Sequence, residues 1–463
     1  MEPDNCTAMT LLRQFRYALT GEERAATSSN VEFIGSGHLA SVFAVTDLAA
    51  AAVGIAALAI ADLVAARWRQ HTRVHIDRRL ASMWFATSIR PQGWKVPPMR
   101  DPLSGDYRTI DGWIRIHANA PPHRAAALSV LDVAPDKEAV TQGVEGWTSD
   151  SLEAAIIEAG GCAATMHSCA EWAANPQGQA VANEPLLHVT PTSACAQVDW
   201  PGRTDRPLLG IRVLDLTRVI AGPVSTRFLA GLGADVLRID PPWWDEPGVV
   251  PDVTLGKRCA RLDLRDPAGR ERFSRLLSQA DIFVHGLRPE ALPRVGLGAE
   301  QRRKIRPGLV EVSLDAYGWT GPWARRRGFD SLVQMSCGIA DAGMRRMNRD
   351  RPTPLPVQAL DHATGYLMAA AAIRGLAQRL RTGLGSEWQT SLASTARVLV
   401  GYPASPAADS LAAELPSDLV ETVEMTGWGP ARRLAPPVII EGTPLRWERP
   451  AGPLGAARAE FAN

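Results

Sequence analysis

The sequence has no excess of charge of either sign. Its 463 residues include 50 Lys and Arg and 49 Asp and Glu, which gives a formal net charge of +1. Proteins that bind nucleic acid usually carry a clear basic excess, so we expect no nucleic-acid partner. Hydrophobic residues make up 46% of the chain and charged residues 21%. This is the composition of a folded globular protein rather than a disordered one.

Cysteine pairs of the CxxC type are also absent. The six cysteines are spread singly along the chain, so neither a zinc site nor a thioredoxin-type motif is predicted, and we expect no metal. Residues 1–4 are polar and acidic, unlike the start of a secretory signal. These features predict a reduced, cytoplasmic protein whose cysteines are small buried apolar residues.

A long uncharged hydrophobic run is lacking too. In the most apolar segment, residues 39–66, Asp47 and Asp62 leave a charge-free stretch of only 14 residues. A membrane-spanning helix needs about 20, so we expect no membrane partner. Alanine loses no side-chain entropy in a helix, and residues 39–70 are therefore predicted as one buried, alanine-rich helix.

Strands and helices alternate in the second half of the chain. The predicted strands are 211–216, 235–239, 281–284 and 309–314, and the predicted helices include 223–232 and 266–279. This order predicts an α/β fold with a Rossmann-like parallel sheet. A smaller α+β domain precedes it and contains a hairpin at residues 107–119. The GxGxxG fingerprint is missing after the first strand, which disfavours an NAD-dependent oxidoreductase.

Two segments share a pattern that predicts an internal repeat. Asp47 and Asp361 each follow a short apolar segment and precede an alanine-rich helix that ends near arginines. Each helix is followed by a polar and hydrophobic stretch, around His75 in the first segment and Trp388 in the second. Two segments that share a pattern in this way are typical of an internal duplication.

Several motifs of the second half occur together in a fixed order. They are Gly210–Pro223, Leu232–Asp240, Gly256–Arg258, Leu287–Pro289, and Tyr317–Pro322 leading to Gly328–Asp330. In this order, across about residues 208–400, they resemble the class III CoA-transferases, the CaiB/BaiF family of formyl-CoA and carnitine CoA-transferases. The resemblance implies that family's fold, and a homodimer because the family forms interlocked dimers.

The first half resembles a different part of the same family. Residues 105–187 are similar to its small domain, which in ordinary members follows the Rossmann-like half. The resemblance therefore implies a fused chain with its halves in permuted order. The expected divisions are an N-terminal helical segment with a partial first repeat (1–100), a small domain (101–190), a linker (191–207), a Rossmann-like CoA-binding domain (208–400) and a C-terminal return segment (401–463).

The resemblance also implies an activity, the transfer of coenzyme A between an acyl-CoA and a carboxylic acid through a covalent aspartyl intermediate. From the residues alone, Asp361 is the N-cap of a helix. The family's nucleophile occupies the same motif position. A carboxylate at a helix start is kept ionised by the free N–H groups, and an ionised carboxylate can attack a thioester. Asp47 is a secondary candidate, either a cap or a second nucleophile.

Eight further residues match family positions that lie near coenzyme A. They are Arg218, Ala221, Gly222 and Pro223 in a loop over the cofactor, and Arg238, Lys257, Arg258 and Arg288 at positions facing its phosphates. Taken singly, each of these four basic residues is more simply a solvated surface charge. Arg325–Arg327 form a denser basic run that could help to hold phosphates.

Two alternatives within this superfamily stay open. One is an acyl-CoA isomerase or racemase. In related racemases a histidine between the Gly and Asp of the last motif moves the α-proton, whereas this chain has Phe329, which cannot titrate. The other is a non-catalytic CoA-binding pseudoenzyme, which the trimmed halves suggest.

Overall fold

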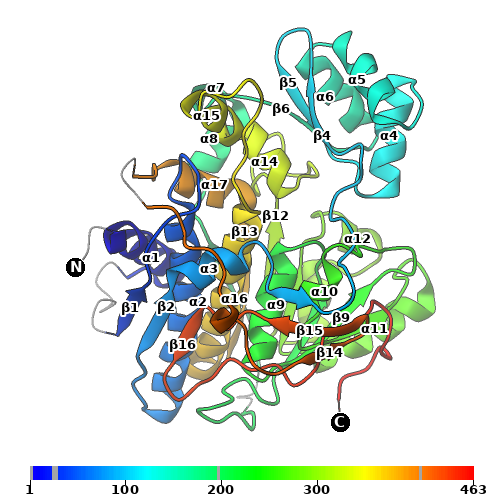
Figure 1. Cartoon of the computed structure of the whole chain (residues 1–463). Coiled ribbons are helices and arrows are strands. Elements are labelled where there is room, and N and C mark those ends of the chain that lie inside the picture. Colours follow the sequence, from blue (N-terminus) through cyan, green and yellow to red (C-terminus); the bar gives the residue numbers. More distant parts are fainter. Residues whose placement is uncertain (1–3, 23–29, 196–198, 406–408, 463) are drawn as a thin grey trace.

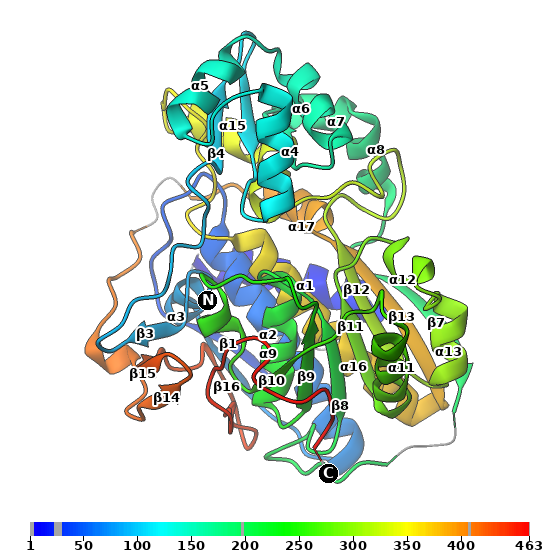
Figure 2. The same cartoon turned by 90° about the vertical axis from the view of Figure 1, so that its right-hand side faces the viewer.

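A computed structural model describes residues 4–22, 30–195, 199–405 and 409–462. Its largest element is a seven-stranded sheet with the order β10-β9-β8-β11-β12-β13-β7. The strands are β7 His188–Ala194, β8 Arg212–Leu216, β9 Asp235–Asp240, β10 Lys257–Arg261, β11 Ile282–His285, β12 Val310–Asp315 and β13 Leu384–Ser391. Six of them are parallel, and β7 joins the edge antiparallel to β13 (Figure 2). The predicted α/β fold with a parallel sheet is therefore confirmed.

Helices cover both faces of this sheet because the side chains of each strand alternate between them. Val213 of β8 packs in one core, which includes helices α2 Val45–Trp68, α9 Ala221–Gly231 and α16 Ala359–Thr382. Leu214 packs in the other core, beneath α11 Pro267–Gln279. Continuous burial on both faces explains the apolar runs that predicted these strands. The shorter helices α10 Val250–Val253, α12 Ala291–Arg294 and α13 Ala299–Ile305 complete this half.

The N-terminal and C-terminal segments meet in a second sheet. Strands β1 Val31–Ile34 and β2 Val74–Asp77 pair in parallel, and β16 Val438–Ile440 adds to β2 antiparallel (Figure 1). A third sheet joins β3 Ile89–Pro91 to β14 Glu424–Thr426 and β15 Gly429–Arg433. Segments at opposite ends of the sequence therefore fold as one body with the large sheet.

The alanine-rich segment forms α2, which begins at Val45 rather than at residue 39. This helix is long and apolar enough to meet the length and composition criteria for a membrane span, but most of it is buried within the protein. It packs against α16 and against α1 Asp4–Thr20, whose apolar side chains enter the same core. Alanine on both long helices lets their backbones come close together.

The two halves of the predicted repeat have matching structures. Helices α2 and α16 each contain 24 residues, and an aspartate, Asp47 or Asp361, is the third residue of each. A strand and a shorter helix follow in both cases, β2 with α3 Arg78–Trp84 and β13 with α17 Leu392–Val400. The side chains of Asp77 and Ser391 cap the two shorter helices.

The small domain stands apart from the large sheet (Figure 1). Its sheet contains β4 Gly105–Arg108, β5 Trp113–Ile116 and β6 Ala163–Thr165, and its helices are α4 Pro121–Leu131, α5 Lys137–Glu145 and α6 Ser149–Glu158. Helices α7 Cys169–Ala174 and α8 Pro176–Asn183 come next in the chain, but their side chains Trp172 and Val181 belong to the core of the large sheet. The predicted hairpin is β4–β5. Two helices from the second half, α14 Asp330–Ser336 and α15 Ile339–Arg346, pack beside this domain.

The predicted linker 191–207 is only partly irregular, because its first residues belong to β7. This strand carries the chain from the small domain back onto the large sheet. Polar and proline residues hid it from sequence analysis, since proline is tolerated mainly on edge strands.

Asp47 and Arg78 form a buried ion pair that we expect to be a major support of the N-terminal half. Asp47 Oδ1 lies 2.7 Å from Arg78 Nη2, and the Arg78 side chain is fully buried. Asp47→Asn leaves that guanidinium without its counter-charge, and removing one partner of a buried pair costs about 3 kcal/mol or more. Urea denaturation should show this loss. Asp62→Asn on the same helix, in a partly exposed pair with Arg16, should cost less than about 1 kcal/mol. Equal losses would contradict this interpretation.

Candidate active site

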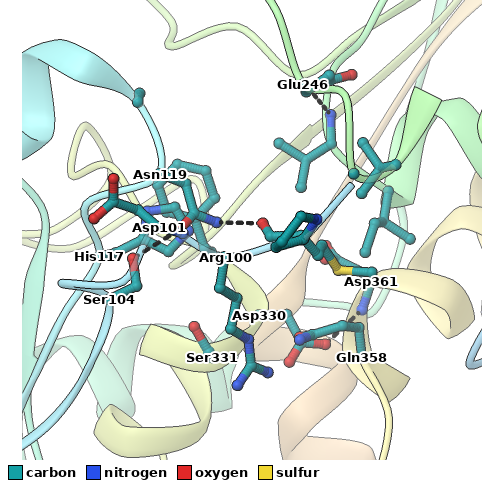
Figure 3. Close-up of a pocket in the computed structure, with 18 of the residues that line it drawn as sticks. Arg100, Asp101, Ser104, His117, Asn119, Glu246, Asp330, Ser331, Gln358 and Asp361 are labelled. Atoms are coloured by element: carbon teal, nitrogen blue, oxygen red, sulfur yellow. Dashed lines mark hydrogen bonds between the residues drawn. The ribbon is translucent and has the colours of Figure 1, made fainter. Parts of the chain in front are cut away.

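A cavity of about 250 Å³ opens beyond the carboxyl ends of β8 and β9. Its walls come from the loops that follow these two strands, from the first residues of α14 and α16, and from residues 98–120, which lead into the small domain (Figure 3). Ligands of open parallel sheets bind in crevices at this edge. Both Asp330 and Asp361 line the cavity.

The two aspartates are joined by the start of α16. Helix α16 begins at Ala359, so Asp361 is its third residue and not its N-cap, contrary to the sequence prediction. Asp330 Oδ2 accepts hydrogen bonds from the backbone N–H groups of Leu360 and Asp361, at 2.9 and 3.0 Å. The cap is therefore supplied by Asp330 from another helix, and the Asp361 carboxyl is left to face the cavity.

Burial raises the pKa of both carboxyl groups. Burial first, and then the negative charge of Asp330, raise the pKa of Asp361 well above its usual range. Burial raises the pKa of Asp330 to about 6, and the two backbone N–H groups, Gln334 and Arg100 limit that rise. Asp361 therefore holds its proton to a higher pH than an exposed aspartate does. The expectation that the helix start keeps it ionised is wrong, because those N–H groups bind Asp330.

Gln358 and Arg100 extend this network to the cavity wall. With its amide oriented so that both ends are paired, Gln358 donates to Asp330 Oδ1 at 2.8 Å and accepts from Arg100 Nη2 at 3.0 Å. Figure 3 shows the Arg100 side chain reaching toward Asp330 and Gln358. Sequence analysis missed Arg100 because it precedes the motifs of the second half.

A neutral histidine stacks on Phe329 at the cavity. The rings of His117 and Phe329 are 3.7 Å apart between centroids and nearly parallel, at 5°. Burial, followed by the charges of His123 and Arg115, lowers the pKa of His117 to about 3. None of the motifs of the second half includes His117, which the small domain places in the wall of the cavity. Its proximity to Phe329 could not be read from sequence spacing.

The loop after β8 is strained where it borders the cavity. Val219 adopts φ +64°, a conformation that is a genuine outlier for a β-branched residue. Its backbone N–H donates to Glu246 Oε2 at 2.9 Å, and Glu246 in turn pairs with the buried Arg238. Backbone strain of this kind persists where the surroundings hold it, and it is common at functional sites.

The predicted cofactor loop lies close to the cavity but has mostly structural contacts. Its residues Val219 and Ile220 line the cavity, and Ala221, Gly222 and Pro223 begin α9. A Cβ on Gly222 would stand 2.2 Å from Thr217 Cγ2, so the glycine is required by the turn itself. The Arg218 guanidinium lies 4.5 Å from the centroid of the Trp244 ring.

The four basic residues that were predicted to face the phosphates of coenzyme A lie in different parts of the structure. Arg238 and Lys257 are not surface charges, because both side chains are fully buried. Arg238 pairs with Asp240 and Glu246. Lys257 Nζ lies 3.2 Å from Asp215, and burial lowers its pKa to about 8. Arg258 pairs with Asp235 across β9 and β10. All three stabilise the sheet in this structure and do not line the cavity.

Arg288 belongs to a second cavity, of about 350 Å³, beyond β11 and β12. Arg325 also lines it, so the two motif arginines gather at one place. His123 lies against Phe329 and near the charges of Arg327 and Arg288. Burial, and then the charges of Arg327 and Arg288, lower its pKa to about 4, and its ring meets that of Phe329 edge-on at 5.9 Å.

Asp47, the secondary candidate, lies away from both cavities. It pairs with Arg78 at 2.7 Å and with His38 at 3.7 Å. Within the described ranges, no group of three or more His, Cys, Asp or Glu side chains is placed to hold a metal ion.

The comparisons with known proteins agree with the motifs. A sequence model of CoA-transferase family III matches residues 208–454, more than half of the chain. The chain belongs to CoA-transferase family III. The match extends beyond the expected end at residue 400 into the C-terminal segment, which pairs with the N-terminal half.

This CoA-transferase family III chain spans about half the length of the curated relatives it matches. An acetyl-coenzyme A transferase, nodX, of Hypoxylon pulicicidum is 31% identical over 61% of this chain and 51% of its own. A succinyl-CoA:glutarate CoA-transferase of Mus musculus is 34% identical over 40% of this chain and 47% of its own. A solved CaiB/BaiF family protein from Brucella suis is 26% identical over 49% and 65%, with a TM-score of 0.39.

The raised pKa of Asp361 predicts that removing its charge stabilises the protein. A carboxyl whose pKa is higher in the folded state than its unfolded value of about 3.9 holds more protons when folded, so stability falls as pH rises above about 4. Asp361→Asn should therefore raise the free energy of unfolding at pH 8 relative to the wild-type protein. This gain should disappear near pH 4.

Urea denaturation across this pH range checks the prediction. Asp47→Asn, at the same position of the other long helix, is the matched control and should destabilise at pH 8. A loss of stability in Asp361→Asn at pH 8 would show that the Asp361 carboxyl is ionised in the folded protein.

Proposed function

We propose that this chain transfers coenzyme A between an acyl-CoA and a carboxylic acid, with Asp361 as the nucleophile. The observation that carries the proposal is a carboxyl group in the wall of a cavity at the ligand-binding edge of the sheet. Its own helix start is already capped by Asp330, so Asp361 has no structural hydrogen bond to give up. Membership of CoA-transferase family III and the names of several relatives support the same activity.

The reaction proceeds by two exchanges at the Asp361 carboxyl. The carboxylate attacks the thioester carbonyl, the C–S bond breaks, and a mixed anhydride and the CoA thiolate form. The thiolate then attacks the aspartyl carbonyl and releases the first acid as its carboxylate. The second acid repeats the two steps in reverse order, which yields the new acyl-CoA and regenerates Asp361. Covalent catalysis of this type replaces one difficult step with easier ones.

Asp361 must lose its proton to solvent before the attack, because only the carboxylate is nucleophilic. Burial raises the pKa of this carboxyl, and a desolvated carboxylate is a stronger nucleophile than a hydrated one. Asp330 stays fixed by its backbone hydrogen bonds and holds the Asp361 backbone in place during the exchanges. The pair thus combines one carboxyl that reacts with one that positions it.

We propose that coenzyme A approaches Asp361 from the side of the second cavity. We propose that Arg288 and Arg325 receive its phosphates there, since guanidinium groups pair well with phosphate oxygens. The pantetheine arm then passes His123 and Phe329 toward Asp361. Arg238, Lys257 and Arg258 have no direct part in this proposal because carboxylates already neutralise them. We also propose that the protein is a homodimer and that it is located in the cytoplasm.

Trapping the intermediate tests the nucleophile. Protein incubated with an acyl-CoA should gain the mass of coenzyme A on the peptide that contains Asp361, and hydroxylamine should discharge it. Asp361→Ala should abolish this adduct. Asp47→Asn, analysed under conditions where it is folded, should retain it. An adduct that survives in Asp361→Ala would refute the assignment, and an unmodified wild-type protein would favour the pseudoenzyme alternative.

The pH dependence of the reaction should reveal the influence of Asp330 on Asp361. Asp330→Asn removes the negative charge that raises the pKa of Asp361 and leaves an oxygen that can accept one backbone N–H. The acidic limb of the kcat/KM profile should therefore move to lower pH. Asp263→Asn, an exposed carboxylate on the surface, serves as the control. A shift toward higher pH in Asp330→Asn would contradict this coupling.

A further inference from the structure

Arg100 is distinguished by its charge environment in the cavity wall. Five acidic residues and two arginines line this cavity: Asp101, Asp245, Glu246, Asp330, Asp361, Arg100 and Arg115. Arg115 is neutralised by Asp106 at 2.5 Å. Within the described part of the chain, no carboxylate lies within the 4.0 Å of an ion pair from the Arg100 guanidinium. The cavity therefore offers an anion one cation whose charge is not already paired.

The guanidinium keeps donors free for a ligand. A guanidinium carries five N–H donors, and Arg100 uses Nη2 toward Gln358 Oε1 at 3.0 Å. Arg100 is an exposed residue and lines the cavity. A carboxylate with two oxygens can bind such a fork bidentately.

The segment that carries Arg100 is held from two sides. Asn119 Oδ1 accepts from the Asp101 N–H at 2.9 Å, and Asn119 Nδ2 donates to the Met99 carbonyl at 3.2 Å. On the other side, a Cβ on Gly248 would stand 2.5 Å from Met99 Cα, so the two loops are in close backbone contact. A cation on a fixed segment loses little freedom when it binds a ligand.

Within the described residues, the Arg100 guanidinium makes no ion pair with Asp361 and is linked to it through Gln358 and Asp330. Gln358 and Asp330 lie between the two, linked by hydrogen bonds of 3.0 and 2.8 Å. The electrostatic effects follow the same order. The charge of Arg100 lowers the pKa of Asp330, whereas burial and the charge of Asp330 raise the pKa of Asp361. A substrate that engages both Arg100 and Asp361 must carry its anionic group away from its reacting carbon.

We propose that Arg100 binds the distal carboxylate of short dicarboxylic acids and of their CoA thioesters, and thereby selects this substrate class. The inference rests on the proposed function, because it assumes that the other end of the substrate reacts at Asp361. Arg100 takes no part in bond making. It is a specificity residue that orients the acyl chain along the cavity.

Steady-state kinetics with different acceptor acids test whether Arg100 selects dicarboxylic acids. Succinate and glutarate are compared with butyrate and valerate, which have the same chain lengths without the second carboxylate. Arg100→Gln should lower kcat/KM for the two diacids roughly 10- to 100-fold, the range expected when a hydrogen-bonded charge loses its partner. It should change kcat/KM for the two monoacids less than about threefold. Arg100→Lys should restore part of the loss, and Arg13→Gln on the exposed face of α1 is the control.

Direct binding separates this inference from the proposed function. Calorimetric titration of Asp361→Asn protein with succinate, with and without Arg100→Gln, needs no turnover. Succinate binding that depends on Arg100 supports the inference, even if no acid accepts coenzyme A and the proposed function fails. Equal succinate binding with and without Arg100, or equal loss of diacid and monoacid transfer in Arg100→Gln, overturns the inference and leaves Asp361 as the proposed nucleophile.

Discussion

The Asp330 carboxylate accepts the backbone N–H groups of Leu360 and Asp361, and the arrangement of the cavity depends on this contact. It fixes the start of α16 against the start of α14, and so joins the core of the large sheet to the helices beside the small domain. It also uses the N–H groups that would otherwise stabilise a charge on Asp361. The Asp361 carboxyl is consequently buried, uncapped and close to a second carboxylate, which are the conditions that raise its pKa.

The two long helices show how a repeated structure can take on two roles. Asp47 and Asp361 occupy the same position of helices of equal length. The first is paired with a buried guanidinium from α3. The second faces Asp330, and α17, which occupies the place of α3, brings it no arginine. The partner brought by the neighbouring helix, rather than the aspartate itself, decides between a structural and a reactive carboxyl.

Sequence analysis predicted the parts of the fold that are governed by local patterns. Strands β8, β9, β11 and β12, helix α11 with its Asp266 cap and the β4–β5 hairpin follow from hydrophobic periodicity and turn residues. The edge strand β7 was missed because it is short of apolar residues, and its partner β13 lies almost 200 residues away. Pairings over such distances leave no local signal.

The candidate site was also only partly predictable from the sequence. Motif resemblance selected Asp361, Arg288 and the loop before α9, which border the two cavities or lie next to them. Arg238 and Lys257 belong to equally recognisable motifs, yet carboxylates on neighbouring strands neutralise them. Arg100 and His117 come from a segment before the motifs, and only the folding of the small domain against α14 and α16 brings them to the cavity. The tertiary structure decides which charged side chains lie close to one another.

The raised pKa of Asp361 distinguishes its carboxyl from that of an exposed aspartate, and infrared spectroscopy tests it directly. The difference spectrum between wild-type and Asp361→Asn protein at neutral pH should contain the C=O stretch of a protonated carboxylic acid. Labelling the aspartates with ¹³C should shift this band. A difference spectrum that contains only the paired bands of an ionised carboxylate would contradict the account, because it would show that Asp361 carries its charge despite its burial beside Asp330.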